Sequence, residues 1–107
     1  IDTLIFDEID VGISGMAAQK VAEKMNVIAA AHQVISITHL PQIAAMADSH
    51  YCIKKMAENG KTVTKIERLS AEESVNEIAR LLGGASITDA VISNAREMKS
   101  MASNIKK

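Results

Sequence analysis

The sequence predicts an α/β fold in which two parallel strands are covered by helices and followed by a β-hairpin. Two apolar runs, residues 3–7 and 34–38, have the composition of strands, because buried parallel strands are almost continuously apolar. From Glu8 to His39 is about 31 positions, which is the length of one βαβ unit. Asn59-Gly60, the preferred dipeptide of a tight turn, marks the hairpin.

The first half of the chain predicts a strand, a helix, a second strand and a short helix. Gly12 lies in a loop after the first strand, and Ser14 is placed to cap the helix that follows. Pro41 suits the first turn of the short helix. The buried face of the long helix is marked by Val21, Met25 and Ile28. The expected bounds are residues 3–7, 16–30, 34–38 and 41–47.

The second half predicts hairpin strands over residues 51–56 and 62–69, then two helices. Ser70 and Glu73 form a capping box for the first helix, and Gly83-Gly84 ends it. Ser86 with Asp89 starts the last helix, whose basic tail we expect to fray. The inward positions are Val75, Ile78, Ala79 and Leu82, then Val91, Ala95, Met98, Ala102 and Ile105. This order of elements implies a mixed sheet with covering helices.

Composition limits the class of protein. A chain of 107 residues is one domain at most, and its net charge of −1 gives no electrostatic argument for nucleic acid or membrane. With only Phe6 and Tyr51 as aromatic residues, bases have almost no stacking platform. The single Cys52 excludes an intrachain disulfide and fits a reducing compartment. Because the chain has no starting Met and begins inside a strand pattern, we expect it to be a piece of a longer protein.

Polar residues of catalytic type follow both predicted parallel strands. Asp7 and Glu8 end the first strand, and His39 follows the second. In open α/β sheets, ligands bind just beyond the carboxyl ends of the strands. Two carboxylates there suit a metal–phosphate site, in which one holds Mg²⁺ and the other handles a water proton. An imidazole could donate a hydrogen bond to a terminal phosphate, so the pattern predicts part of a nucleotide-hydrolysis site.

Each of these residues also has an ordinary structural interpretation. A strand end can turn polar simply because it meets solvent, and a lone histidine near a strand end is often structural. The Gly-Ile-Ser-Gly loop that follows Asp10 suits close approach by backbone or ligand, which favours the functional interpretation. We expect His32 and His50 to be surface residues and Cys52 to be a small core residue.

Two runs of the sequence resemble a known family. Thr-Leu-Ile-Phe-Asp-Glu-Ile-Asp at residues 3–10 resembles the Walker B strand of ATP-binding-cassette ATPases, in the version of SMC-like DNA repair proteins. Val-Gly-Ile-Ser-Gly at residues 11–15 looks like their D-loop. Thr-His-Leu-Pro-Gln at residues 38–42 resembles the switch-histidine segment of the RecN family, and Ala-Arg-Leu-Leu-Gly-Gly at residues 79–84 also resembles that family. The resemblance covers essentially the whole chain.

The resemblance implies a fold and a set of residue roles. Residues 1–107 would be the C-terminal portion of a P-loop ATPase head of the ABC/SMC type, without its N-terminal lobe and coiled coil. Asp7 would hold Mg²⁺, Glu8 would be the catalytic carboxylate, and His39 would be the switch residue at the γ-phosphate. The D-loop residues that communicate across a dimer of heads would be Asp10, Ser14 and Gly15.

The resemblance also implies partners and a biological setting. The implied cofactors are ATP and Mg²⁺. The implied partners are a second head, which forms a homodimer on ATP binding, and DNA in double-strand-break repair, with no membrane partner. The implied location is the bacterial cytoplasm, at the nucleoid. The 107 residues contain neither a Gly-rich Lys-Ser/Thr phosphate loop nor a Ser-Gly-Gly signature, so we expect the isolated segment to be inactive.

Two alternatives stay open at the level of sequence. One is the head of another SMC-like or transporter ATPase, and the other is a non-catalytic interaction domain with the same strand–helix pattern. An upstream phosphate loop, heptad repeats and a signature motif would distinguish an ATPase head from an interaction domain.

Overall fold

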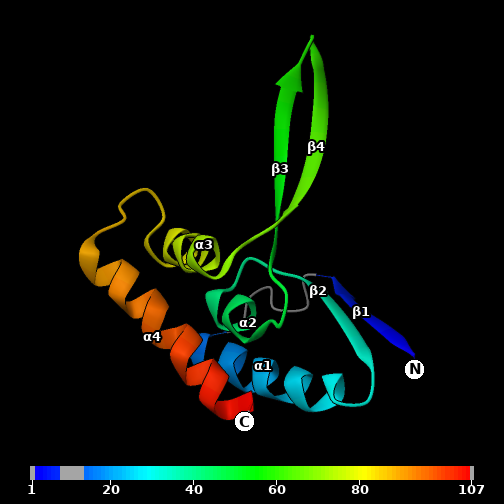
Figure 1. The fold of residues 1–107 in the computed structure, drawn as a ribbon, viewed down its shortest axis with the longest axis vertical. Coiled ribbons are helices and arrows are strands. Elements are labelled where there is room, and N and C mark those ends of the chain that lie inside the picture. The colour runs from blue at the N-terminus through cyan, green and yellow to red at the C-terminus, as the bar shows by residue number, and fades with distance from the viewer. Residues whose placement is uncertain (1, 8–13, 107) are drawn as a thin grey trace.

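The computed structural model describes residues 2–7 and 14–106. Its elements agree with the predicted ones to within about two residues, which is the usual uncertainty of element ends. Helices pack together in the body of the molecule, and the hairpin projects from it (Figure 1). The elements are β1 (Thr3–Asp7), α1 (Gly15–Ala29), β2 (Gln33–Ile37), α2 (Pro41–Met46), β3 (Tyr51–Glu58), β4 (Lys61–Arg68), α3 (Ala71–Gly83) and α4 (Asp89–Lys106).

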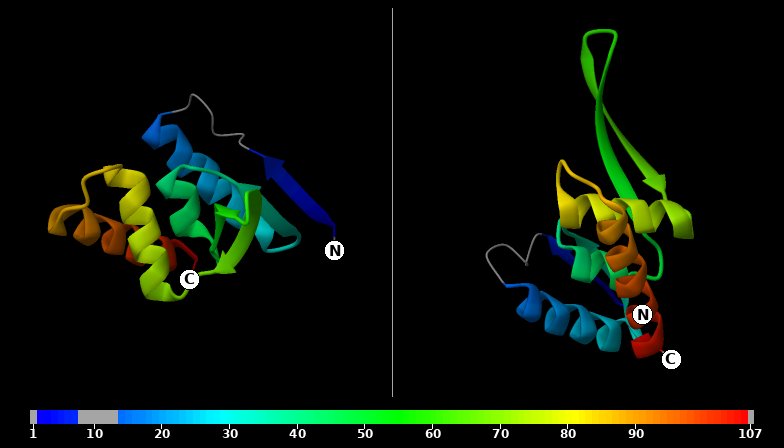
Figure 2. Two further views of the ribbon diagram at one scale, coloured as in Figure 1. Left: turned by 90° about the horizontal axis from the view of Figure 1, so that it is seen from above. Right: turned by 90° about the vertical axis from the view of Figure 1, so that its left-hand side faces the viewer.

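Within the described ranges the strands form two separate sheets, so the expected mixed sheet is wrong. β1 and β2 pair in parallel, with Thr3 opposite Gln33 and Asp7 opposite Ile37. β3 and β4 pair antiparallel with each other and project away from the parallel pair, as Figures 1 and 2 show. The projection separates the two sheets, because strands must lie side by side to share hydrogen bonds. The predicted parallel strands, trailing hairpin and covering helices are confirmed.

The hairpin turn follows from its two central residues. Asn59 and Gly60 have φ angles of 49° and 77°, and Glu58 pairs with Lys61 across the turn. A two-residue turn with both central φ angles positive matches the twist of the flanking strands, and asparagine and glycine tolerate that backbone best. The predicted Asn-Gly turn is confirmed.

Side chains cap the starts of α1 and α3. The Ser14 hydroxyl accepts a hydrogen bond from the Ala17 N–H at 3.2 Å, as the sequence predicts. In the capping box of α3, the Ser70 hydroxyl accepts from the Glu73 N–H at 3.2 Å, and the Glu73 carboxylate accepts from the Ser70 N–H at 2.9 Å. Each such cap satisfies helix donors that have no partner within the helix.

Both ends of α4 differ from expectation. Thr88, rather than Ser86, accepts from the Val91 N–H, at 3.3 Å, because it lies directly before the first helical residue. The last turn does not fray: Lys106 lies on the inward face and its ammonium pairs with Asp48 at 3.1 Å. Ile105, one position away from that face, is 41% exposed, so its predicted burial is wrong.

The core consists of two clusters of buried side chains between the helices. In one, α3 packs against α2 and α4; in the other, α1 packs against α2, with α4 and the inner side chains of the parallel strands. The many alanines allow close approach of these short helices. The clusters contain Ala44, Ala45, Val75, Ile78, Ala79 and Ala95, and Ala22, Met25, Ile43, Met46 and Ala102.

Replacement of Ile78 by Ala is expected to destabilise the chain by about 2–5 kcal/mol, because it leaves a cavity at a fully buried position. Urea denaturation followed by circular dichroism measures the loss. Ile87, which is 48% exposed in the loop before α4, provides the matched control, and its replacement by Ala should have less than half that effect. Equal losses for both variants would contradict the assignment of Ile78 to the core.

Candidate functional site

The parallel register brings the ends of β1 and β2 to one edge of the sheet. Asp7 is the last residue of β1 and lies opposite Ile37, the last residue of β2. His39 follows Ile37 by two positions, and both Asp7 and His39 are exposed. β1 and β2 are therefore paired as the predicted closeness of the Asp7 and His39 segments requires. The other two carboxylates of the predicted site, Glu8 and Asp10, lie outside the described residues.

His39 sits in a short, constrained connection between β2 and α2. The Leu40 N–H donates a hydrogen bond to the Thr38 hydroxyl at 3.0 Å, and Pro41 occupies the first turn of α2. Such a side-chain bond two residues apart fixes a tight turn, and proline fixes the backbone that follows. Because α2 is itself buried from Ile43 to Met46, the imidazole is exposed but its backbone is firmly anchored.

The first residues of α1 lie against the first turn of α2. Ser14 and Gly15 are exposed at the start of α1. A Cβ atom on Gly15 would lie 3.1 Å from Nε2 of Gln42, which is closer than side chains normally approach. The end of the predicted D-loop and the segment after His39 are thus in direct contact.

Gln42 is a site neighbour that sequence reasoning did not single out, although it ends the Thr-His-Leu-Pro-Gln run. Its Oε1 atom is buried and has no hydrogen-bond partner among the described residues. Gln42 also lines a small cavity of about 50 Å³ between α1, α2 and α4.

The described residues supply only part of a metal site. No group of three His, Cys, Asp or Glu side chains lies together within residues 2–7 and 14–106. Asp7 is a single carboxylate at the strand end. Mg²⁺ in nucleotide sites usually has one or two carboxylates, several waters and the phosphate oxygens of the substrate, so one carboxylate fits such a site but not a protein-only cage.

A second polar cluster lies away from the strand ends. His50, predicted at the surface, is half-buried and its Nδ1 lies 2.6 Å from the Ser74 hydroxyl, so that prediction is wrong. Lys99 donates to the same hydroxyl at 2.9 Å. The cluster borders a groove of about 540 Å³. The sequence held one signal of it, a serine next to Val75 on the apolar face of a helix.

In the part of the chain that the structure describes, every helix is too short or too polar to cross a membrane.

The chain is similar in sequence to curated DNA repair proteins. RecN of Bacillus subtilis (strain 168) is 43% identical over 106 residues, which are 99% of this chain and 18% of that protein. RecN of Deinococcus radiodurans is 44% identical over 96 residues, which are 90% of this chain and 17% of that protein. The chain thus spans less than a fifth of the length of these relatives. No protein-family model matches it.

The fold is similar to that of a solved SMC ATPase, a structure from work on ATP-driven dimerization and DNA-stimulated activation. The TM-score is 0.62 and the identity 23%, over 80% of this chain and 51% of that chain. At this identity the likeness concerns the fold, while the RecN relatives give the sequence relationship. The chain is therefore similar in sequence to one part of the RecN proteins and similar in fold to one part of a solved SMC ATPase.

Proposed function

We propose that the chain is the C-terminal portion of the ATPase head of a RecN-type protein of DNA double-strand-break repair. It contributes the Walker B strand, the D-loop and the switch-histidine segment. The observation that carries the proposal is the parallel register of β1 and β2, which puts Asp7 and the segment of His39 at the same sheet edge. Nucleotide phosphates bind at this edge in open α/β sheets.

In the longer protein, three side chains of this segment act on ATP. Asp7 holds Mg²⁺ through water, Glu8 polarises the attacking water, and His39 contacts the γ-phosphate. Phosphoryl transfer needs positioning and charge stabilisation more than covalent chemistry, and these side chains supply both. The exposure of Asp7 and His39 supports the proposal, because their side chains are free to meet a ligand.

The outer face of the parallel sheet supports the view that further protein completes the head. Ile5, Ile35 and Ile37 alternate with inward-facing residues and are 66%, 44% and 42% exposed. Parallel sheets are normally covered on both faces, so an open isoleucine face suits packing against the rest of the head. That part supplies the phosphate loop and the signature motif.

The cycle involves two heads and DNA. ATP binding closes two heads into a homodimer, with Asp10, Ser14 and Gly15 communicating between the sites, and hydrolysis reopens them. This couples ATP turnover to DNA tethering at the nucleoid in the cytoplasm. The ATP-driven dimerization and DNA-stimulated activation of the structurally similar SMC ATPase support this part of the proposal.

The isolated 107 residues are expected neither to bind Mg-ATP tightly nor to hydrolyse it. Much of nucleotide affinity comes from the backbone amides and lysine of a phosphate loop, which the sequence lacks. Titration calorimetry with Mg-ATP tests this expectation. Micromolar ATP binding by a monomer would overturn the claim that the chain holds only part of the site.

The same chain is expected to self-associate through its open sheet. Light scattering should give a mass above the 11.5 kDa of the monomer, because an exposed apolar strand can pair with another copy. Replacement of Ile5 by Lys should restore the monomer, whereas Ile87→Lys, in the loop before α4, should not. A monomeric wild-type chain would contradict the expectation.

A further inference from the structure

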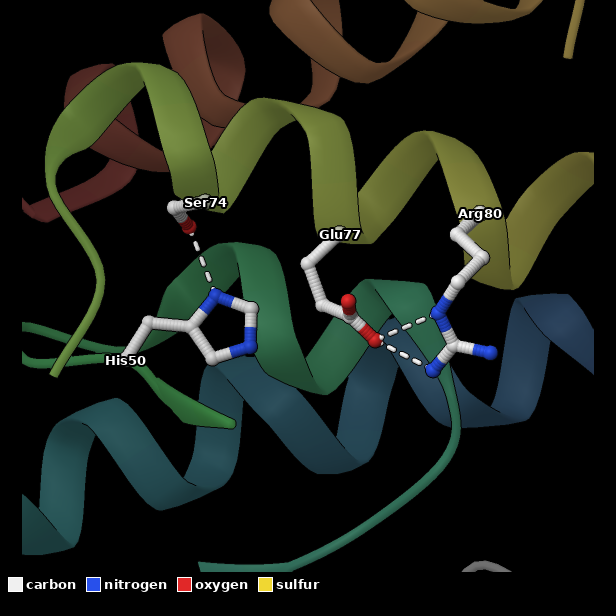
Figure 3. Close-up of polar contacts among 4 residues, drawn as sticks. All are labelled: His50, Ser74, Glu77 and Arg80. Atoms are coloured by element: carbon white, nitrogen blue, oxygen red, sulfur yellow. Dashed lines mark hydrogen bonds and ion pairs between the residues drawn. The ribbon is translucent and has the colours of Figure 1, made fainter. Parts of the chain in front are cut away.

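Three side chains from separate parts of the chain meet at the root of the hairpin. His50 directly precedes β3, Ser74 lies on α3 and Lys99 on α4. The Ser74 hydroxyl is 2.6 Å from Nδ1 of His50 and 2.9 Å from Nζ of Lys99, and Ser74 is 1% exposed. Figure 3 shows the imidazole of His50 pointing at Ser74. The cluster therefore joins the hairpin to both C-terminal helices.

Chemistry fixes the direction of the Lys99–Ser74 hydrogen bond, and the tautomer of His50 decides the direction of the His50–Ser74 bond. The Lys99 ammonium has donors only, so the Ser74 oxygen accepts from it. The Ser74 O–H is then free to donate to Nδ1 of His50. This chain of donors requires a neutral imidazole with its proton on Nε2.

Charged groups around His50 favour the neutral form. Burial lowers the pKa of His50 below its ordinary value, Lys99 lowers it further, and Glu77 acts in the opposite direction. Glu77 is engaged with Arg80, as Figure 3 shows, which reduces its effect on the imidazole. The other charged groups that line the groove or pair with its lining are Asp48, Arg68, Glu73 and Lys106.

Protonation of His50 would remove the acceptor on which the cluster depends. Nδ1 would become a donor, so His50 and Lys99 would both direct an N–H at one hydroxyl oxygen. Two positive charges would then face each other across a buried serine. Unpaired or like charges in such a place are unfavourable, and outward movement of the imidazole relieves them.

The backbone of His50 also belongs to the hairpin root. The Leu69 N–H donates to the His50 carbonyl at 2.8 Å, directly beyond the Tyr51–Arg68 pair that ends the strand ladder. The ring thus holds α3 and α4 while the carbonyl holds the end of β4. We propose that the His50–Ser74–Lys99 cluster is a pH-dependent contact, which holds the hairpin root against α3 and α4 only while His50 is neutral.

The sign of the pH dependence follows from the lowered pKa of His50 in the folded chain. As pH falls through about 6.5, the unfolded chain binds the proton first. The contribution of the cluster to stability is therefore complete above that pH, and is lost as pH falls to the lower pKa of the folded state. The proposal does not depend on the ATPase function.

The test is a pH titration of the 107-residue chain by NMR, with ¹⁵N-labelled histidine and amide exchange at Leu69. We expect Nδ1 of His50 to be unprotonated at neutral pH, and a titration midpoint below about 6.5. The protection factor of the Leu69 amide should fall at least about tenfold through the same transition. A proton on Nδ1 at neutral pH, or unchanged Leu69 protection below the midpoint, would overturn the proposal.

A pair of lysine variants separates the cluster from general charge effects. Lys99→Met keeps the apolar stem but removes the charge that faces His50, so the His50 midpoint should rise. Lys24→Met, on the exposed side of α1, should leave the midpoint unchanged. Equal midpoints in the wild type and Lys99→Met would contradict the proposed coupling, and the wild-type titration decides the matter if a variant does not fold.

Discussion

In the full-length protein, replacement of Glu8 by Gln is expected to abolish ATP turnover while leaving ATP binding largely intact. The substitution keeps the size of the side chain but removes the charge that we propose polarises the attacking water. Losses of about 10²–10⁴-fold are usual for a positioned general base. Steady-state turnover and the Kd for Mg-ATP, measured on the same preparation, check both parts of the expectation.

Glu97→Gln provides the matched control for Glu8→Gln, because Glu97 is an exposed carboxylate on α4. Its turnover should equal that of the wild type. If Glu8→Gln retained turnover within about twofold of the wild type, Glu8 would not be the catalytic carboxylate.

Replacement of His39 by Ala in the full-length protein should lower kcat more than it weakens ATP binding. The proposed contact of the imidazole with the γ-phosphate would matter most as negative charge develops there, and loss of one such donor typically reduces kcat by about 10²-fold. The exposed position of His39 gives no reason to expect unfolding. Single-turnover hydrolysis together with ATP binding separates the two effects.

His39→Gln keeps a hydrogen-bond donor, so we expect part of the turnover to return in that variant. The contradicting outcome for His39→Ala is that much of the protein unfolds while the fraction that stays folded has normal specific activity. That result would make His39 a packing residue and would remove it from the site.

The local features of the fold could be predicted because they depend on neighbouring residues. Ser14 and the Ser70–Glu73 pair cap helices through bonds that span three residues, and the Asn59-Gly60 turn follows from backbone preference. The pairing of β1 with β2 follows from two apolar runs one βαβ unit apart. The shared sheet edge of Asp7 and the segment of His39 rests on that same pairing, while their roles in a site stay a prediction.

The features that sequence reasoning missed depend on contacts between distant residues. Ser74 and Lys99 lie 24 and 49 positions after His50, and Lys99 is joined to His50 only through the Ser74 hydroxyl. No local sequence pattern pairs these residues. The separation of the two sheets depends on where the hairpin leaves the body. Ile105 fits the apolar spacing of α4, but packing against the other helices decides which face of α4 is buried. That face contains Ala102, and the neighbouring Lys106 pairs with Asp48.

The proposed metal and hydrolysis site is tested most directly by Mn²⁺ binding to the full-length protein in the presence of ATP. Mn²⁺ is paramagnetic and takes the oxygen ligands that suit Mg²⁺, so electron paramagnetic resonance reports its bound fraction. We expect Asp7→Asn to weaken ATP-dependent Mn²⁺ binding about tenfold or more, as loss of a metal-site partner usually does. The control Asp89→Asn, in the first turn of α4, should bind as the wild type does. Equal Mn²⁺ affinity in Asp7→Asn and the wild type would contradict the assignment of the β1 end to the ATP site.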